Sequence, residues 1–321
     1  MKAIRVSTTG GPEVLEWVDV PDPVPGPDEL LIEVEYAGLN FIDTYQRSGV
    51  YKMESPFIPG QEGSGRVIGR GEDVEGWWDG TRVAWTNQMG SYAQKIVIPA
   101  SAALYVPDSV RMDTAAALPL QGMTAHYLIR SVYPVDLGTK ILITGAAGGV
   151  GRIAGQLAST QGAISIGTVS SEEKLAFTDT THSIVVSDWA TIKQEVTDRV
   201  GLLDVVYDGV GKASFDHTIT CLRPRGLMCL FGGASGQVPP FDLQRLNALG
   251  SLYITRPTLA NYLGQEQEWR WSELTERTAA GHLDILIGKV FDAQYANKAH
   301  AHIESGKSIG KTLIKIHSAT N

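Results

Sequence analysis

A glycine-rich turn between an apolar strand and a helix is the segment with the clearest chemical use. Residues 141–144 form an apolar run that leads into Gly145, and a helical apolar pattern begins at Ile153. Because glycine has no side chain, the backbone of such a turn can approach a pyrophosphate closely. The first N–H groups of the helix offer the pyrophosphate hydrogen bonds and a positive potential. Ala146, Gly148 and Gly151 fill the three places of G-x-G-x-x-G. We predict a dinucleotide-binding loop rather than a tight turn used only for packing, with binding residues Ala147, Gly148, Gly149, Val150 and Gly151.

The end of the next predicted strand indicates which nicotinamide cofactor fits. NAD sites usually place an acidic residue there to bind the ribose 2′-hydroxyl. This chain has Ser170 and Ser171 followed by Glu172, Glu173 and Lys174. Two hydroxyls and a lysine suit a 2′-phosphate, so we predict NADPH, held by Ser170, Ser171 and Lys174. The alternative is that Lys174 is an ordinary solvated charge, and the preference requires the two glutamates to point away.

Composition and charge narrow the classes of partner. With 43% hydrophobic and 19% charged residues the chain has material for a sizeable core, and its formal charge of −8 disfavours nucleic acid and anionic membranes as partners. Neither a signal peptide nor a membrane span is evident, so we expect a cytoplasmic protein. The only cysteines, Cys221 and Cys229, are too few for a disulfide framework or a four-cysteine zinc site, and we expect them to be buried.

The order of predicted elements indicates two domains. Short strands separated by glycine and proline dominate residues 1–118, which suggests a small barrel-like β domain. From residue 140 strands alternate with helical patterns, as a parallel α/β sheet requires. A helical stretch and a final strand close the chain, so the α/β domain is inserted into the β domain. The predicted parallel strands are 140–144, 163–169, 184–187, 205–208, 227–231 and 252–255.

Several motifs, in the right order along nearly the whole chain, resemble the zinc-free quinone oxidoreductases of the medium-chain dehydrogenase/reductase superfamily, which include the zeta-crystallins. The most specific is residues 40–51, NFIDTYQRSGVY. The resemblance implies a GroES-like catalytic domain (1–122 and 258–321), a Rossmann domain (123–257), a cleft between them, and a homodimer. The last Rossmann strand, 252–255, is an apolar edge that invites pairing. The other matching segments are residues 10–15, 59–65, 146–151, 205–211 and 250–257.

The resemblance also assigns site residues. Asn40, Tyr45 and Tyr51 are expected to line the acceptor site beside the nicotinamide, with Asn40 also contacting the cofactor. Asp43 and Arg47 are expected to orient the 40–51 loop or to pair with each other. Thr124, in a turn at residues 121–125, is expected near the nicotinamide ribose. The loop after the fifth Rossmann strand is expected to pass the nicotinamide end through Phe231, Gly232 and Ser235.

A catalytic zinc is not expected. The related alcohol dehydrogenases use a Gly-His-Glu segment and cysteines, whereas this chain has Gln61 at the histidine position and no cysteine before Cys221. Without these ligands the zinc site cannot form. His300 and His302 lie on different faces of a predicted helix, and we expect both to be solvated.

Two departures from the family pattern bear on cofactor affinity. A tyrosine that often follows the third strand is replaced by Ser187-Asp188, and a lysine is replaced by Gln121. Both changes predict weaker contacts to the cofactor.

These features favour NADPH-dependent quinone reduction by hydride transfer, with the second proton taken from solvent. No residue stands out as a pKa-tuned acid or base, which agrees with a reaction that depends mainly on positioning. A reductase of enones or 2-alkenals is the close alternative. A non-catalytic NADPH-binding protein, crystallin-like or redox-sensing, is the alternative of a different class.

Overall fold

The computed structural model describes residues 1–316 and divides the chain into two compact units. Unit 1 comprises Met1–Leu120 and Trp271–Asn321, and unit 2 comprises Gln121–Arg270. The first boundary lies near residue 122, where the sequence places it, but the second lies inside helix α8 (Gln267–Ala279) rather than near residue 258. The intervening residues pack within unit 2, where Tyr262 stacks on Tyr127 at 4.4 Å between ring centroids. Residues 317–321, which the sequence assigns to the GroES-like domain, lie outside the described residues.

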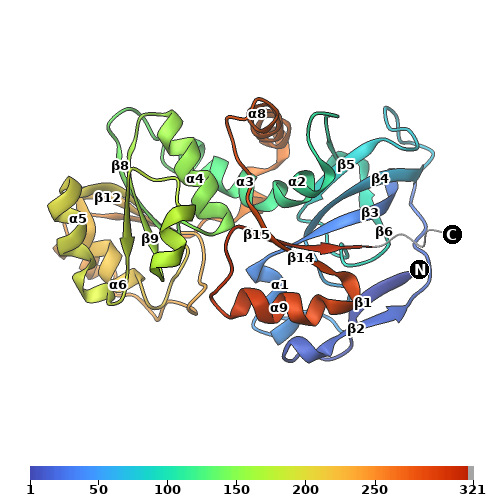
Figure 1. Cartoon of the computed structure of the whole chain (residues 1–321), viewed down its shortest axis with the longest axis horizontal. Helices are drawn as coiled ribbons and strands as arrows, with labels where there is room; N and C mark the ends of the chain where they lie inside the picture. The colour runs from blue at the N-terminus through green and yellow to red at the C-terminus, as the bar shows by residue number, and fades with distance from the viewer. Residues whose placement is uncertain (317–321) are drawn as a thin grey trace. The chain divides into compact units, whose positions relative to one another are not determined.

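Unit 2 is built on a six-stranded, fully parallel sheet with strand order β10-β9-β8-β11-β12-β13. Figure 1 labels β8, β9 and β12 of this sheet. This is the doubly wound 3-2-1-4-5-6 order of a dinucleotide-binding domain. Its strands are β8 (Lys140–Thr144), β9 (Ile164–Val169), β10 (His182–Val185), β11 (Leu203–Asp208), β12 (Leu222–Leu230) and β13 (Tyr253–Thr255). Its helices include α3 (Pro119–Tyr127, which begins in unit 1), α4 (Gly149–Thr160), α5 (Ile192–Val200), α6 (Phe215–Thr218) and α7 (Gln244–Ala248).

The six predicted parallel strands are all present, and the bounds of β8 agree fully with the prediction. The largest difference is β12, which begins at Leu222 because Arg225, with φ 60°, and Gly226 turn the chain without ending the strand. Apolar side chains on one face of the sheet form a buried cluster that includes Leu142, Ile166, Val206 and Met228, which are paired across neighbouring strands. On the opposite face Ile141, Ile143 and Val205 are 0% exposed. Buried side chains on both faces explain why these strands are continuous apolar runs.

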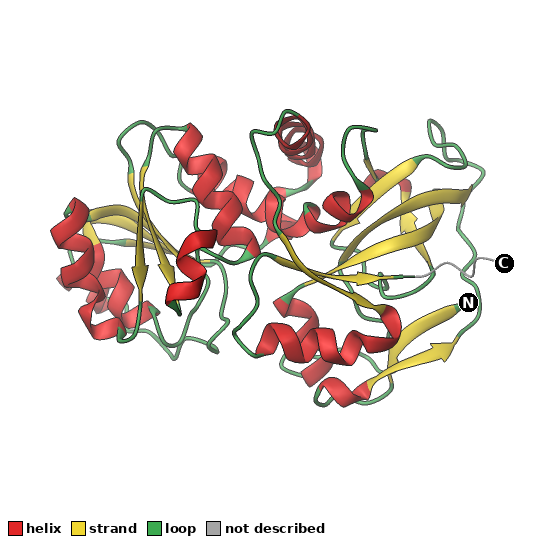
Figure 2. Ribbon diagram, in the orientation of Figure 1, coloured by secondary structure: helices red, strands yellow, loops and turns green. Residues whose placement is uncertain are grey.

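Unit 1 contains a seven-stranded sheet of order β14-β15-β3-β4-β5-β7, with β6 paired to β3, and a separate β1–β2 hairpin. Figure 2 draws the strands in yellow, in the same orientation as Figure 1. All pairs are antiparallel except β14 with β15. In β3 the residues Leu30, Ile32 and Val34 are buried in alternation, as the sequence pattern predicts for a half-buried strand. The strands are β1 (Lys2–Val6), β2 (Leu15–Asp19), β3 (Glu29–Leu39), β4 (Glu62–Arg70), β5 (Arg82–Thr86), β6 (Lys95–Pro99), β7 (Leu104–Tyr105), β14 (Ile287–Asp292) and β15 (Lys311–Lys315).

The helices of unit 1 are α1 (Phe41–Ser48), α2 (Met112–Ala117), α9 (Ala296–Glu304) and most of α8. Helices α1 and α9 lie side by side (Figure 1), joined by an ion pair between Arg47 and Glu304 at 2.7 Å. Within residues 1–316 no helix has both the length and the apolar character needed to cross a bilayer.

Candidate functional site

The glycine-rich turn has the shape expected of a pyrophosphate-binding loop. Gly145 adopts φ 67° and its carbonyl accepts a hydrogen bond from the Gly148 N–H at 2.9 Å, which closes the turn before α4. A Cβ at Gly151 would lie 2.5 Å from the Gly145 carbonyl oxygen, so only glycine permits this close packing of helix against turn. The N–H groups in the first turn of α4, from Gly149 to Gly151, have no intrahelical acceptor and are available to an anion.

The candidate 2′-phosphate residues follow β9, the strand paired in parallel with β8. They therefore lie at the same end of the sheet as the glycine-rich turn, where the strands have their carboxyl ends. Ser170 is exposed, and Lys174 is half-buried in the 3₁₀ helix η4 (Glu172–Phe177). Desolvation lowers the pKa of the Lys174 ammonium, and an anion bound beside it would favour the charged form. The side chains of Glu172 and Glu173 are exposed.

The loop that follows β12 is hydrogen-bonded to the loop that follows β11. The N–H groups of Phe231 and Gly232 donate to the Asp208 carbonyl at 2.9 and 3.2 Å, and the Ser235 hydroxyl donates to the Val210 carbonyl at 2.7 Å. Phe231, Gly232 and Ser235 therefore lie at the carboxyl ends of adjacent parallel strands, where ligands bind in open α/β sheets.

Asp208 is a residue that sequence reasoning did not single out. Its fully buried carboxylate accepts hydrogen bonds from the backbone N–H groups of Val210 and Gly211, at 2.8 and 3.1 Å, and from the hydroxyls of Thr144 and Ser214. The available signal was an acidic residue at the end of an apolar strand, directly before a glycine.

Thr124 lies in helix α3, not in a turn as predicted. Gly122 lies inside this helix and does not interrupt it, because the flanking residues 121–127 are buried and packing compensates for the low helix propensity of glycine. The Thr124 side chain is 7% exposed. The helix continues into a π-helical turn at Leu128–Val132, where the hydroxyl of Tyr207 donates to the Leu128 carbonyl at 2.9 Å.

The 40–51 segment is largely helical, so its description as a loop is wrong. Asn40 is the N-cap of α1, the Asp43 carboxylate accepts the Asn40 N–H at 2.9 Å, and Gly49 ends the helix in the left-handed region with φ 84°. The rings of Tyr45 and Tyr51 are in edge contact at 5.5 Å.

Phe41 joins these rings, although the sequence analysis did not select it. Its ring lies 6.4 Å from that of Tyr45, one helical turn further on. Phe41 and Tyr51 are 38% and 39% exposed, so this aromatic cluster (Phe41, Tyr45, Tyr51) presents apolar surface at one side of unit 1.

Asp43 and Arg47 do not pair with each other. Arg47 donates to both carboxylate oxygens of Glu304, at 2.7 and 3.1 Å, and lies 3.2 Å from Nδ1 of His300. Asp43 instead accepts the hydroxyl of Tyr92 at 2.9 Å, while its other oxygen, Oδ1, is buried without a partner. Burial raises the pKa of Asp43 to about 7.

The prediction that His300 and His302 are both solvated is wrong for His300. His300 is fully buried on the side of α9 that contacts Arg47 of α1. Burial, together with the nearby Arg47 guanidinium, lowers its pKa to about 3. His302 is half-buried against Phe291. Sequence spacing does not reveal this difference, because the partner of His300 comes from a helix some 250 residues earlier.

Gln61 occupies the position at which the zinc-dependent alcohol dehydrogenases carry a histidine. Gln61 is buried and its amide Nε2 lies 3.0 Å from the Met89 sulfur. Residues 1–316 contain no group of three or more His, Cys, Asp or Glu side chains arranged to hold a metal ion. Cys221 and Cys229 are buried, as predicted, and burial raises the pKa of each thiol to about 12.

Both departures from the family pattern have structural roles in unit 2. Asp188 accepts the Ala190 N–H at 2.9 Å and caps a short 3₁₀ helix. The side chain of Gln121 lies against Gly149, where a Cβ would be 1.6 Å from its Oε1 atom. Gln121 therefore packs directly on the first turn of α4.

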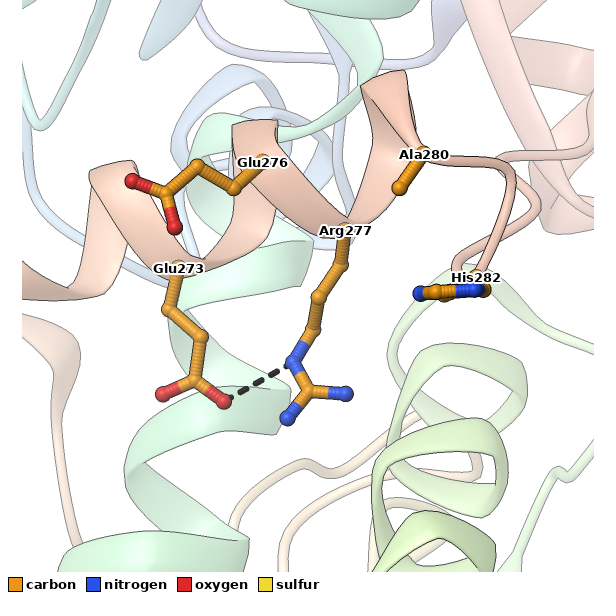
Figure 3. A pocket seen from close by; sticks show the side chains of 5 residues that line it. All are labelled: Glu273, Glu276, Arg277, Ala280 and His282. Carbon is orange, nitrogen blue, oxygen red and sulfur yellow. Dashed lines mark hydrogen bonds and ion pairs between the residues drawn. The ribbon is translucent and has the colours of Figure 1, made fainter.

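A separate hollow on unit 1 holds none of the candidate site residues. It is lined by the end of α8 and the turn that follows, and within it Arg277 pairs with Glu273 at 2.9 Å (Figure 3). Its five lining residues are Glu273, Glu276, Arg277, Ala280 and His282.

The inserted parallel sheet, its glycine-rich turn and the flanking antiparallel unit define a medium-chain dehydrogenase/reductase. Two family models match the chain, the alcohol dehydrogenase GroES-like domain at residues 26–108 and the zinc-binding dehydrogenase model at residues 184–314. The chain is 38% identical to a quinone oxidoreductase of Pseudomonas aeruginosa over 98% of its length and 99% of that protein. It belongs to the quinone oxidoreductase family of this superfamily, which confirms the fold and the family predicted from the sequence.

Two further relatives bear on cofactor and substrate. A solved Escherichia coli quinone oxidoreductase in complex with NADPH has a TM-score of 0.93 and 34% identity, covering 98% of this chain and all of that one. A 2-haloacrylate reductase of a Burkholderia species is 35% identical over 97% of this chain and 98% of that protein. The family therefore contains reductases with different acceptors.

Proposed function

We propose that this protein is a zinc-independent reductase that uses NADPH to reduce quinones. The main support for the proposal is the carboxyl end of the unit 2 sheet. There the glycine-rich turn follows β8, and Ser170, Ser171 and Lys174 follow the paired strand β9. That arrangement suits a pyrophosphate and a 2′-phosphate at once. The NADPH complex of the related E. coli enzyme supports the same cofactor.

The aromatic cluster on α1 and in the turn after it supports an acceptor with a flat ring. Exposed aromatic rings favour stacked or edge contacts with a planar, electron-poor ligand. When bound, NADPH supplies a hydride, so the protein mainly has to orient the acceptor and limit access of water. The quinone also takes up one proton, which we expect to come from solvent.

The test is loss of NADPH absorbance with matched panels of quinones and 2-alkenals, in wild type and in Tyr51→Phe. We expect faster turnover of quinones and a loss of about two- to thirteen-fold in Tyr51→Phe, the value of one neutral hydrogen bond. A loss of several thousand-fold confined to the alkenals would identify Tyr51 as a proton donor and favour an alkene reductase, which the 2-haloacrylate reductase relative makes the second candidate. Absence of turnover with either panel would favour a non-catalytic NADPH-binding protein.

Lys174→Ala is expected to weaken NADPH binding by roughly 10- to 150-fold and to leave NADH binding nearly unchanged. The reason is that a charged hydrogen bond to the 2′-phosphate is lost, and NADH has no such phosphate. Fluorescence titration with both nucleotides measures the two affinities. Lys193→Ala, an exposed lysine of the same unit, is the matched control and should change neither. Equal effects of Lys174→Ala on both nucleotides would place the phosphate site elsewhere.

We also propose a homodimer joined through the free edge of β13. This strand ends the unit 2 sheet, and Tyr253 and Ile254 are 63% and 38% exposed. An unpaired apolar edge favours pairing with a second copy. Light scattering at micromolar concentration should give the dimer mass for wild type and the monomer mass for Ile254→Arg. Leu137→Arg, at another exposed apolar position of unit 2, should remain dimeric. A monomeric wild type would refute the assembly and leave the proposed reaction untouched.

A further inference from the structure

A buried ion pair lies beneath the N-terminus of α1. Glu62 of β4 is fully buried and Lys311 of β15 is 3% exposed, and the Lys311 ammonium donates to Oε1 of Glu62. The same ammonium donates to Oδ1 of Asn40, the N-cap of α1, at 2.8 Å. Two strands therefore bring opposite charges to the residue where α1 begins.

The two oxygens of Glu62 serve different parts of unit 1. Oε1 accepts from Nδ2 of Asn40 at 2.8 Å, whereas Oε2 accepts from the backbone N–H of Leu120 at 2.6 Å. Leu120 is the last residue of unit 1 before the chain enters unit 2. The carboxylate is held in place by shape as well, because a Cβ at Gly38 would lie 2.4 Å from Oε1.

The side chain of Asn40 is fully occupied within this network. Its Nδ2 donates to Glu62 and, at 3.2 Å, to the Gly38 carbonyl, while its Oδ1 accepts from Lys311. An amide has two donor hydrogens, and both point to protein acceptors. Asn40 thus has no hydrogen left for an acceptor oxygen.

We infer that Asn40, Glu62 and Lys311 form a positioning network that fixes the start of α1 together with the Leu120 backbone. They act on the acceptor through the aromatic cluster, not by touching it: α1 carries Phe41 and Tyr45, and the Tyr51 N–H donates to the Tyr45 carbonyl at 3.0 Å. The part of this inference that concerns the acceptor rests on the proposed function. The part that concerns α1 and Leu120 does not.

The test compares Glu62→Gln, Lys311→Met and the double variant with Val67→Ala, a buried apolar truncation in the same strand. Glutamine keeps the shape of Glu62, but its amide nitrogen cannot accept a hydrogen bond and leaves Lys311 without its counter-charge. Three quantities are measured: kcat/KM for the acceptor, Kd for NADPH, and hydrogen–deuterium exchange of peptides covering α1 and Leu120.

We expect Glu62→Gln and Lys311→Met each to lower acceptor kcat/KM about tenfold or more, with NADPH Kd changed less than about twofold. Exchange should rise in the α1 and Leu120 peptides. The double variant removes both charges, so its loss should be smaller than the product of the single losses. Val67→Ala should lower Tm without selective exchange in those peptides.

Unchanged exchange of α1 and Leu120 in the charge variants would overturn the inference, as would parallel losses in acceptor kcat/KM and NADPH affinity. If Glu62→Gln does not fold, Lys311→Met and the charge-neutral double variant decide the question by the same measurements. If the wild type reduces no acceptor, the proposed function fails while the exchange data still test the network.

Discussion

As the pH rises from 5 to 8, the free energy of unfolding of Asp43→Asn is expected to increase by about 2.5 kcal/mol relative to that of the wild type. Burial raises the pKa of Asp43 to about 7, from 3.8 in an exposed carboxyl. The folded protein therefore holds this proton over a range in which the unfolded chain has lost it. The contribution of protonated Asp43 to the free energy of unfolding is fully present below pH 3.8 and is lost as the pH rises through 7. Asparagine does not titrate, so it avoids that loss.

The geometry explains why the charged form is unfavourable. Oδ2 of Asp43 accepts the Asn40 N–H and the Tyr92 hydroxyl, but Oδ1 is buried without a hydrogen-bond partner. The nearest charges have opposite signs, with Lys311 favouring the carboxylate and Glu62 opposing it. His300 has the reverse dependence, since its pKa of about 3 removes stability as the pH falls below 6.5. His300 is present in both the wild type and Asp43→Asn, so its contribution largely cancels when their free energies of unfolding are compared.

Urea unfolding of both proteins at several pH values measures this difference. Asp22→Asn is the matched control, because Lys95 lowers the pKa of that exposed carboxyl to about 2 and confines its effect to more acidic solutions. Between pH 5 and pH 8 its curve should run parallel to that of the wild type. Parallel curves for Asp43→Asn as well would show that Asp43 is ionised in the folded protein throughout this range.

The parallel sheet was predictable because both of its faces are buried. A strand such as β8, with Ile141, Leu142 and Ile143 all 0% exposed, is a continuous apolar run that needs no information from elsewhere in the chain. The glycine-rich turn was equally local in its signal, since the hydrogen bond from Gly148 to Gly145 and the close packing of Gly151 both lie within residues 145–151. Short-range chemistry therefore specified the predicted cofactor loop.

Helix α1 was missed because its buried face is polar. Asp43, Thr44, Gln46 and Arg47 point inward, which reverses the apolar periodicity that identifies most surface helices. The sequence did contain a signal for this helix: Asn40 and Asp43 have the spacing of an N-terminal capping pair, and Gly49 is a typical helix end. Tyr45 and Tyr51 were selected from the resemblance, but the helix that holds Tyr45 beside Phe41 was not predicted.

The partners of buried polar residues were beyond sequence reasoning. Glu62 meets Lys311 across strands far apart in the chain, and His300 meets Arg47 across two helices. A single sequence contains no signal for such pairs, because each residue type is most often exposed. Asp208 belongs to the same class, although its donors are mostly nearby in sequence.

Asp208→Ala is expected to lower the free energy of unfolding by about 3 kcal/mol or more and to weaken NADPH binding at least about tenfold. The substitution leaves three donors without an acceptor, the N–H groups of Val210 and Gly211 and the Thr144 hydroxyl. Those N–H groups fix the loop after β11, to which the loop carrying Phe231 and Ser235 is hydrogen-bonded. Both loops should therefore lose their positions together.

Asp208→Asn separates the carboxylate's shape from its charge. Its carbonyl oxygen can replace Oδ1 as acceptor for the two loop N–H groups, and its NH₂ group faces the hydroxyls of Ser214 and Thr218, which can rotate to accept. The loss should then stay below about 1.5 kcal/mol. Thr218→Val removes the longest of the Asp208 bonds, at 3.3 Å, together with a 3.5 Å contact to the Phe215 carbonyl, and serves as the matched control. Urea unfolding and NADPH titration of the three variants measure both effects. If Asp208→Ala resembled Thr218→Val in stability and affinity, the loops would be held by their backbone hydrogen bonds alone, and Asp208 would have no part in shaping the cofactor site.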